Sequence, residues 1–546
     1  MHIHSALLKP PPPPPAATPG NGSYRKAFPL AIGKPSVGVV RRRAPSMLRC
    51  KGIQVSDPKE KLSSSIGCSR NGVAKSVGVK EVDVATLGNL CVDIVLNVPQ
   101  LPPASMEERK KYMDQLSASP PDKSTVHPFW CLTNMRFRYI VKVKVKTAVH
   151  VSTIAFSDCI RMNEKYIYFN VYVYKLTIQK NWEAGGSCNM AIAASRLGLS
   201  CITIGHVGKE IYGNFLVDVL QNENIGMVGM DKDDNVTNNF SASRETLLCW
   251  VLVDPSQRHG FCSRADFCQE PAFSWMSGLS PEVEVAIQQS KTIFCNGYGF
   301  DDFSPRLLTA ALNYAVEVGT SIFFDPGPRG RSLSVGSLDE QRALDHFLRM
   351  SDVLLMTSDE AQSLTGVKDP IQAGKDLLRN GVRTKWVIIK MGARGSVLIT
   401  TSSISCVPAF KVNVCDTVGC GDSFVAAIAY GYIHKLSKIN ALTLANAVGA
   451  ATATGSGAGR NVATLEKVLN IMKGSSLNED ETFWCSLLHE HLDTEDCSLL
   501  CKETDNSRRF GHLNHVSLQK VVSELLPKLN SSMSEHSLPS KYIFSR

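Results

Sequence analysis

Short runs of β-branched and other apolar residues alternate with helix-like segments along most of this 546-residue chain. The run VDVATLG over 82–88 predicts a strand, whereas NMAIAASRLG over 189–198 has apolar spacings of three and four and predicts a helix. Further strand-like runs lie at 201–205, 247–253, 293–296, 321–325 and 353–356. Repeated alternation of strand and helix favours a mostly parallel sheet with helices on both faces. In such a sheet, ligands bind beyond the carboxyl ends of the strands.

The second half of the chain continues this pattern. The runs 387–390 and 396–399 flank Gly392 and Gly395 and predict a hairpin. Two long helices rich in small residues follow, over 422–434 and 439–454. The polar segment beyond 474 is predicted to be weakly ordered, with one amphipathic helix near 518–529.

The stretch DTVGCGDSF, residues 416–424, leads directly into the first of these long helices. Gly419 and Gly421 permit positive φ angles and leave their amide groups uncovered, and the helix start adds unpaired N–H donors. Such a loop suits an anion such as a phosphate group. Asp422 serves either as an N-cap or as a base that takes a proton from a hydroxyl group. We expect the helix dipole to lower its pKa, so that the carboxylate is ionised at pH 7.

The net charge of +9 is unevenly distributed along the chain. Residues 1–50 contain eight Lys and Arg and no acid, and 125–180 carry a balance of +7, so the remainder is acidic. An acidic body binds phosphate backbones poorly, and no nucleic-acid partner is expected. No apolar stretch is long enough to predict a membrane span. The 17 cysteines lack metal-binding spacing and are predicted to be reduced thiols.

The first 55 residues have the composition of a targeting segment. They contain a run of prolines from Pro10 to Pro15 and an Arg cluster at 41–43, and no acid occurs before Asp57. Such a composition is typical of a disordered organelle transit peptide. The proline run disfavours the amphipathic helix of a mitochondrial signal, so the chloroplast is favoured over the mitochondrion or the cytosol. The alternative is a Pro-rich tail without a targeting role.

The segment 125–180 does not fit the pattern around it. From Arg136 to Lys180 it is dense in Lys, Tyr, Ile, Phe and Asn, whose codons are AT-rich, and it has no turn residues between its strand-like runs. We interpret it as a retained intron or another artefact of the gene prediction. A genuine β insertion that enlarges a lid is the alternative. If the segment is translated, we expect it to impair folding or activity.

Two motifs, in this order, resemble those of the pfkB carbohydrate kinase family, the ribokinase-like group. GGSCNMAIAASRLGL, from Gly185, is similar to the family's N-terminal Gly-Gly and Asn motif, and DTVGCGDSFVAAIAYG is similar to its C-terminal motif. Among members, the chain looks most like plant plastid pfkB-like proteins without an assigned substrate. The resemblance implies a three-layer α/β/α kinase domain over 80–472, with a mostly parallel sheet and a small β lid. The segment 125–180 is then an atypical insertion, and 474–546 is a C-terminal extension.

The resemblance also implies an activity, which is transfer of the γ-phosphate of ATP to a hydroxyl group of a sugar, a sugar-like molecule or a nucleoside. Asp422 would be the catalytic base, and Gly419, Cys420 and Gly421 would form the anion hole for the transferring phosphoryl group. ATP and Mg²⁺ are the expected cofactors, with K⁺ as an optional cation. A homodimer fits the family because lid strands pair between subunits in some members.

The other positions implied by the resemblance contact the sugar, the nucleotide or a cation. The sugar-binding positions are Asp93 at the end of the first strand, Gly185, Gly186 and Asn189. The nucleotide-binding positions are Lys390, Gly392, Gly395, Asn446 and Gly457. The cation-binding positions are Glu360 for magnesium, and Asp416 and Thr417 for a monovalent ion.

Some of these residues also have a purely structural interpretation. Asp93 could cap a turn, Asn189 could cap a helix, and Glu360 could be a solvated acid in the first turn of a helix. Thr357 replaces the Asn of the family's Asn-x-x-Glu motif, and Cys420 replaces an Ala and adds an oxidisable thiol. Such departures keep a second hypothesis open, in which the protein is a catalytically silent scaffold or regulator in the plastid.

Overall fold

The computed structural model describes residues 80–102, 108–109, 111, 182–230, 245–256, 258–263, 266, 268, 270–474, 476–492, 496–502 and 513–532. All of them belong to one compact unit, Lys75–Arg546. The predicted transit peptide over 1–55 and the segment 125–180 lie outside the described residues. No helix among the described residues is long and apolar enough to cross a bilayer.

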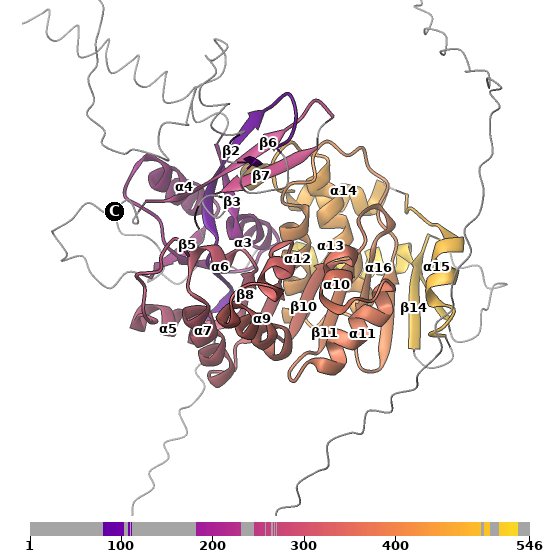
Figure 1. Ribbon diagram of the computed structural model, residues 1–546. Coiled ribbons are helices and arrows are strands. Elements are labelled where there is room, and N and C mark those ends of the chain that lie inside the picture. Colours follow the sequence, from indigo (N-terminus) through magenta and orange to yellow (C-terminus); the bar gives the residue numbers. More distant parts are fainter. Residues whose placement is uncertain are drawn as a thin grey trace, which may run out of the picture. The chain divides into compact units, whose positions relative to one another are not determined.

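A large sheet of eleven strands forms the centre of this unit (Figure 1). Its strand order is β15-β14-β13-β12-β11-β10-β9-β8-β1-β4-β5, and only the pairs of β12 with β11 and β13 are antiparallel. The strands are β1 (Val82–Leu87), β4 (Cys201–Gly205), β5 (Ile225–Gly229), β8 (Ser290–Asn296), β9 (Ser321–Asp325), β10 (Val353–Thr357), β11 (Trp386–Lys390), β12 (Ser396–Ile399), β13 (Ser403–Val407), β14 (Asp496–Cys501) and β15 (Leu513–Ser517). The predicted α/β class and the hairpin between β11 and β12 are confirmed, with the 3-10 turn η4 (Gly392–Arg394) at its tip.

A second sheet of four strands forms the lid predicted from the sequence. Its order is β3-β2-β6-β7, with strands β2 (Leu90–Asn97), β3 (Trp182–Gly186), β6 (Leu247–Val253) and β7 (His259–Ser263). One of its faces packs on the main core through Val92, Trp182 and Trp250. The opposite face, which includes Val251 and Val253, contacts Val418 of the predicted anion loop. The lid sheet therefore lies against the loop that precedes the long C-terminal helices.

Helices cover both faces of the large sheet, as the alternation of residues along each strand requires. In β11, Ile388 belongs to one buried cluster, and Val387 and Ile389 belong to the other. The helices of the first cluster are α3 (Ser187–Arg196), α4 (Ile211–Asn222), α12 (Cys420–Ile433), α13 (Lys438–Ala453), α14 (Leu465–Gly474) and α16 (Leu518–Ser532). The helices of the second are α5 (Pro281–Gln289), α6 (Gly299–Asp302), α7 (Pro305–Glu317), α8 (Arg329–Ser334), α9 (Leu338–Met350), α10 (Ser358–Thr365), α11 (Pro370–Asn380) and α15 (Glu481–Leu488).

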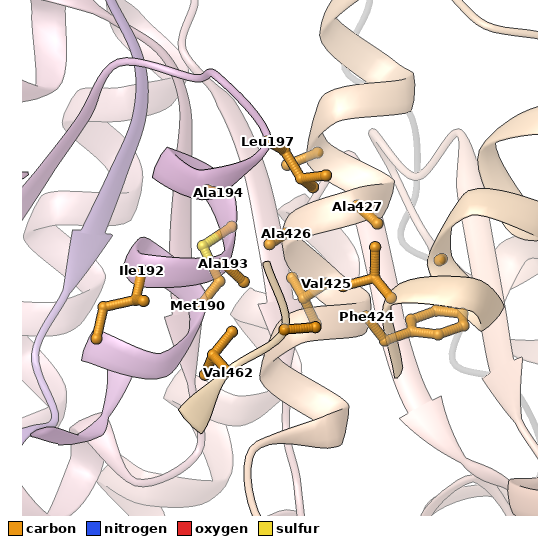
Figure 2. Packing of buried hydrophobic residues seen from close by; sticks show 14 of the residues in the cluster. Met190, Ile192, Ala193, Ala194, Leu197, Phe424, Val425, Ala426, Ala427 and Val462 are labelled. Atoms are coloured by element: carbon orange, nitrogen blue, oxygen red, sulfur yellow. The ribbon is translucent and has the colours of Figure 1, made fainter. Parts of the chain in front are cut away.

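Helices α3 and α12 pack side by side, although they come from opposite ends of the kinase region (Figure 2). Both helices carry almost fully buried small residues, such as Ala193, Ala194, Ala426 and Ala427, and side chains of this size let the two backbones approach closely. This packing places the N-terminal Gly-Gly motif beside the C-terminal anion loop.

The C-terminal extension is better ordered than the sequence predicts, and this expectation is wrong for its described residues. Strand β14 pairs in parallel with β13, and β15 pairs in parallel with β14, so the extension adds two strands to the large sheet. The predicted amphipathic helix is present as α16, and its Val521, Leu525 and Leu529 are fully buried. Local polarity misled the prediction because burial here depends on distant surfaces of α13 and α14, which α16 contacts.

The packing of α16 leads to a stability prediction. Replacement of Leu525 by Ala removes a fully buried side chain, so we expect the free energy of unfolding to fall by about 2–5 kcal/mol. Gln519→Ala, on the exposed side of the same helix, should change it by no more than about 0.5 kcal/mol. Urea unfolding of the two variants measures the difference. Equal stabilities would mean that the extension contributes nothing to the core.

Candidate active site

Polar side chains gather where the parallel strands β9 and β11, which flank β10 in the large sheet, end. Asp325 is the last residue of β9, and Lys390 is the last residue of β11. The Lys390 ammonium lies 2.6 Å from Oδ2 of Asp325, and both side chains are largely buried. The carboxyl ends of the strands are the expected ligand side of a parallel sheet.

Asp422 lies in the first turn of α12, next to this ion pair. The N-cap of α12 is Gly419, with φ of 76°, so the N-cap interpretation of Asp422 is wrong. Its Oδ2 instead accepts a hydrogen bond of 3.3 Å from Nδ2 of Asn189. Asn189 is the third residue of α3, whose N-cap is Gly186, so Asn189 is not a helix cap either. The side-chain amide of Asn189 therefore joins the N-terminal motif directly to Asp422.

The electrostatics of Asp422 differ from the prediction. Burial and the neighbouring Asp325 carboxylate raise its pKa to about 7, while Lys390 and the Asn189 hydrogen bond oppose this rise. The predicted lowering by the helix dipole is outweighed because desolvation disfavours the charged form. A carboxyl group with a pKa near neutrality is well matched to proton transfer at physiological pH.

The loop before α12 is held in place by Asp416. Its Oδ1 accepts from the Val418 amide at 2.9 Å and its Oδ2 accepts from the Gly457 amide at 2.6 Å. His259 of β7 approaches Oδ1 at 3.0 Å. The carboxylate is thus engaged within the protein, while the side chain of Thr417 is exposed. These contacts indicate that Asp416 shapes the loop, and they lend no support to the predicted monovalent cation.

The Gly419–Gly421 turn offers the N–H donors of a helix start to one side of the site. A Cβ atom added to Gly421 would lie 3.7 Å from Nζ of Lys390, so the ammonium faces this turn. Burial, together with the carboxylates of Asp416 and Asp422, raises the pKa of the Cys420 thiol to about 12. Cys420 is therefore a neutral thiol, which is less prone to oxidation than the sequence analysis expects.

Glu360 lies in the first turn of a helix, as its structural interpretation predicts, but it is partly buried rather than solvated. It forms a capping box at the start of α10: Thr357 donates its amide to Oε2 of Glu360 at 2.7 Å, and the Thr357 hydroxyl accepts the Glu360 amide. Burial and the Asp325 carboxylate raise the pKa of Glu360, and Lys390 opposes the rise. Glu360 is thus a helix acid beside the ion pair, and Thr357 replaces Asn without loss of the cap.

Burial alone would lower the pKa of Lys390, but the carboxylates of Asp325 and Glu360 outweigh it and raise the pKa. The lysine is therefore a permanent cation within a cluster of acids. Among the described residues, no three His, Cys, Asp or Glu side chains converge on one metal position. Asp325 and Glu360 nevertheless provide the one or two carboxylates with which proteins hold Mg²⁺ beside substrate phosphates.

Asp93 lies in the lid, within β2 and not at the end of the first strand as predicted. It pairs with Glu183 of β3 and Cys249 of β6 and is almost fully buried, so it caps no turn. Burial raises its pKa to about 7, a hydrogen bond from Cys91 opposes the rise, and the carboxylates of Asp422 and Glu183 add to it. The predicted sugar-binding acid therefore lies near Asp422.

Gly185 makes room for Asp93. A Cβ atom at Gly185 would lie 2.0 Å from Oδ1 of Asp93, so any larger residue would displace the Asp93 carboxylate. Gly186, the neighbouring residue, has φ of 59° and ends β3 where α3 begins. The Gly-Gly pair thus brings β3, Asp93 and the start of α3 into one corner of the site.

The predicted nucleotide-binding residues differ in where they lie and in what they contact. Gly392 and Gly395 lie in the β11–β12 turn beyond Lys390, and Gly457 lies beside the anion loop. Asn446 is buried and donates its amide hydrogens to the carbonyls of Val407 and Pro408. Its amide thus holds β13 to α13, which speaks against the predicted contact with adenosine.

Sequence reasoning missed two residues of the site. Asp325 is one, and it ends a buried strand at the sheet edge where ligands are expected, so the signal was available. Tyr298 is the other, in the loop after β8. Burial raises the pKa of its hydroxyl, and the Cys249, Asp301, Asp422 and Glu360 groups add to the rise. Nothing in its local sequence distinguishes it from a structural tyrosine.

An anion-binding helix start, a carboxylate and a buried lysine at the carboxyl edge of a parallel sheet are typical of phosphoryl-transfer enzymes. Residues 152–465 match the family described as pfkB family carbohydrate kinase. The chain therefore belongs to the pfkB family, and it is an ATP-dependent phosphotransferase that acts on an alcohol group of a sugar.

The chain is similar to several known proteins. The chain is 26% identical over 301 residues to "Probable fructokinase-4" of Arabidopsis thaliana, covering 53% of this chain and 87% of the relative. It is 26% identical over 304 residues to "Probable fructokinase-6, chloroplastic" of the same plant, covering 53% of this chain and 74% of the relative. The structure of Arabidopsis thaliana ribokinase complexed with ribose and ATP has a TM-score of 0.45 and 15% identity, covering 72% of this chain and 99% of that one.

The contact between Gly185 and Asp93 predicts a specific defect in sugar binding. In Gly185→Ala the new methyl group displaces the Asp93 carboxylate, so the KM for the sugar should rise by about tenfold or more. Gly278→Ala is the matched control because a Cβ there meets nothing within 4 Å. Steady-state kinetics of both variants measure the effect, and an unchanged KM in Gly185→Ala would exclude Asp93 from the sugar site.

The raised pKa of Asp422 predicts the pH dependence of kcat/KM, which reports on the free enzyme. A base works only when ionised, and the Asp422 pKa of about 7 means that the group gains protons as the pH falls through neutrality. We therefore expect kcat/KM to rise from about pH 6 to about pH 8 and then to level off. A flat profile over this interval would show that the carboxylate is already ionised, as the helix dipole alone would make it.

Proposed function

We propose that Asp422 is the catalytic base of this kinase and that the Gly419–Gly421 turn stabilises the phosphoryl group during transfer. The observation that supports this most strongly is the meeting of Asp422, Asn189 and Lys390 at the start of α12. Two motifs that are 233 residues apart in the chain share one hydrogen bond at this point.

In the proposed mechanism, Asp93 and the Gly185–Gly186 corner hold the sugar through its hydroxyl groups. Asp422 then takes the proton from the hydroxyl that attacks the γ-phosphate of ATP, and its near-neutral pKa suits this transfer. The amides of the Gly419–Gly421 turn and the Lys390 ammonium face the phosphate oxygens, where negative charge spreads in the transition state. The lid sheet lies over the site and keeps water away from the phosphoryl group.

The same carboxylate cluster fits a magnesium ion. Burial and the neighbouring Asp325 carboxylate raise the pKa of Glu360, and a second cation beside these two carboxylates would offset their repulsion. When bound, Mg²⁺ would neutralise charge on the ATP phosphates. We do not extend the proposal to K⁺, because Asp416 is already engaged with two amides and His259.

We also propose that the protein works in the plastid. The acid-free, Arg-containing segment over 1–55 supports this, and so does the chloroplastic name of one Arabidopsis relative. The acceptor is a sugar, and the choice among sugars and nucleosides depends on side chains around Asp93 and on the lid. Homodimer formation is a further part of the proposal, supported by the exposed Phe261 on the edge strand β7 of the lid.

A screen of ATP consumption over a panel of sugars and nucleosides tests the proposed function. Asp422→Asn keeps the size and the position of the side chain but cannot accept the proton, so turnover should fall by about 10²- to 10⁴-fold. Asp345→Asn, an exposed acid on α9, is the control and should leave turnover unchanged.

Two outcomes would contradict the proposal in different ways. Unchanged turnover in Asp422→Asn would remove Asp422 as the base while leaving the kinase activity. Absence of turnover by the wild-type protein on every member of the panel would favour the second hypothesis, a catalytically silent scaffold or regulator.

A further inference from the structure

Glu183 and Arg460 form an ion pair that joins the lid to the turn after α13. Glu183 lies on the lid strand β3, and Arg460 lies in the 3-10 turn η5 (Gly459–Asn461). Nε of Arg460 donates to Oε2 at 3.1 Å, and Nη2 donates to Oε1 at 3.0 Å, so both carboxylate oxygens are used. The backbone amide of Arg460 also donates to Oε2, at 3.1 Å. Such a two-pronged contact fixes orientation as well as distance.

The turn that carries Arg460 lies directly against β3. A Cβ atom at Gly459 would lie 2.8 Å from both N and O of Ala184, so the backbones touch. Nη2 of Arg460 donates to the carbonyl of Trp182 at 2.9 Å. On the other side, Arg196 of α3 donates to the carbonyl of Arg460 at 3.1 Å. The turn is thus held between the lid strand and the helix that carries Asn189.

From this turn a short series of hydrogen bonds leads to Asp422. The Gly459 amide donates to Oδ1 of Asn189 at 2.7 Å, and Nδ2 of Asn189 donates to Asp422 at 3.3 Å. Because an amide side chain has one oxygen and one NH₂ group, the donor on Gly459 forces the NH₂ group toward Asp422. Without that donor, Asn189 could turn its oxygen toward the carboxylate, which would repel it.

We propose that the Glu183–Arg460 pair is a latch that positions the catalytic base. It holds η5 on the lid strand, so that the Gly459 amide keeps Asn189 oriented toward Asp422. Neither Glu183 nor Arg460 contacts Asp422, so both are positioning residues that act through Asn189. The latch also makes the base dependent on lid placement, because Glu183 lies opposite Asp93 on the strand beside the sugar site. This inference rests on the proposed role of Asp422.

Three variants test the latch: Glu183→Gln, Arg460→Met and the double variant. Each single change breaks the ion pair while it nearly keeps the size of the side chain. We expect kcat to fall by about tenfold to a hundredfold in each, with the KM for ATP changed by less than about twofold, because the base is misplaced while ATP binding is kept. The double variant should lose no more than either single one, since both remove the same interaction. Arg460→Lys keeps the positive charge but loses the contact of two guanidinium nitrogens with the carboxylate. Its kcat should therefore lie between that of Arg460→Met and that of the wild type.

A measurement that needs no substrate accompanies the kinetics. Hydrogen exchange of the backbone segment 455–462 should be faster in Glu183→Gln than in the wild type, because the Arg460 amide loses its charged acceptor and the turn no longer holds the Gly459 amide firmly on Asn189. Arg379→Met, which breaks the exposed pair with Asp376 on α11, should change neither exchange nor kcat.

The outcomes separate the latch from the proposed function. If hydrogen exchange of the segment 455–462 is the same in folded Glu183→Gln as in the wild type, the latch is overturned, whatever the activity. The latch is also overturned if this exchange is faster but kcat is unchanged. A wild-type protein without turnover would refute the proposed function, and exchange alone would then decide whether Glu183 fixes the turn.

Discussion

The packing of α3 on α12 holds the whole site together. Each helix begins at a glycine with positive φ, Gly186 or Gly419, and each carries one polar residue of the site in its first turn. Alanines at the contact let the helices approach, so Asn189 reaches Asp422 without a bridging water or a long side chain. A larger residue at this contact would separate the two motifs and would act on catalysis without touching any reacting group.

The site concentrates more negative than positive charge. Asp325, Glu360 and Asp422 surround one lysine, and Asp93 adds a fourth carboxyl group from the lid. Burial and mutual repulsion raise the pKa values of Asp93, Glu360 and Asp422, a cost that an ordinary core would avoid. Such raised pKa values are typical of functional sites, where the positive charge that offsets the carboxylates arrives with the ligand.

Much of the fold could be predicted because it depends on local patterns. The strand 321–325 and the hairpin across Gly392 follow from apolar runs and turn residues, and the structure has both. Asp93 was misplaced because the sequence cannot tell which of two sheets an apolar strand joins. The pKa of Asp422 was misjudged because its neighbours come from β9, β11 and α3, which no local argument brings together.

The extension shows that the limits of a family and the limits of a folding unit can differ. The family match ends at residue 465, yet β14, β15 and α16 lie beyond it and complete the same sheet and the same core. A boundary drawn at 465 would leave β13 as a bare sheet edge and would uncover α13 and α14 where α16 packs. For this protein, the region that matches the family is therefore only part of the folding unit in which the residues of the site meet.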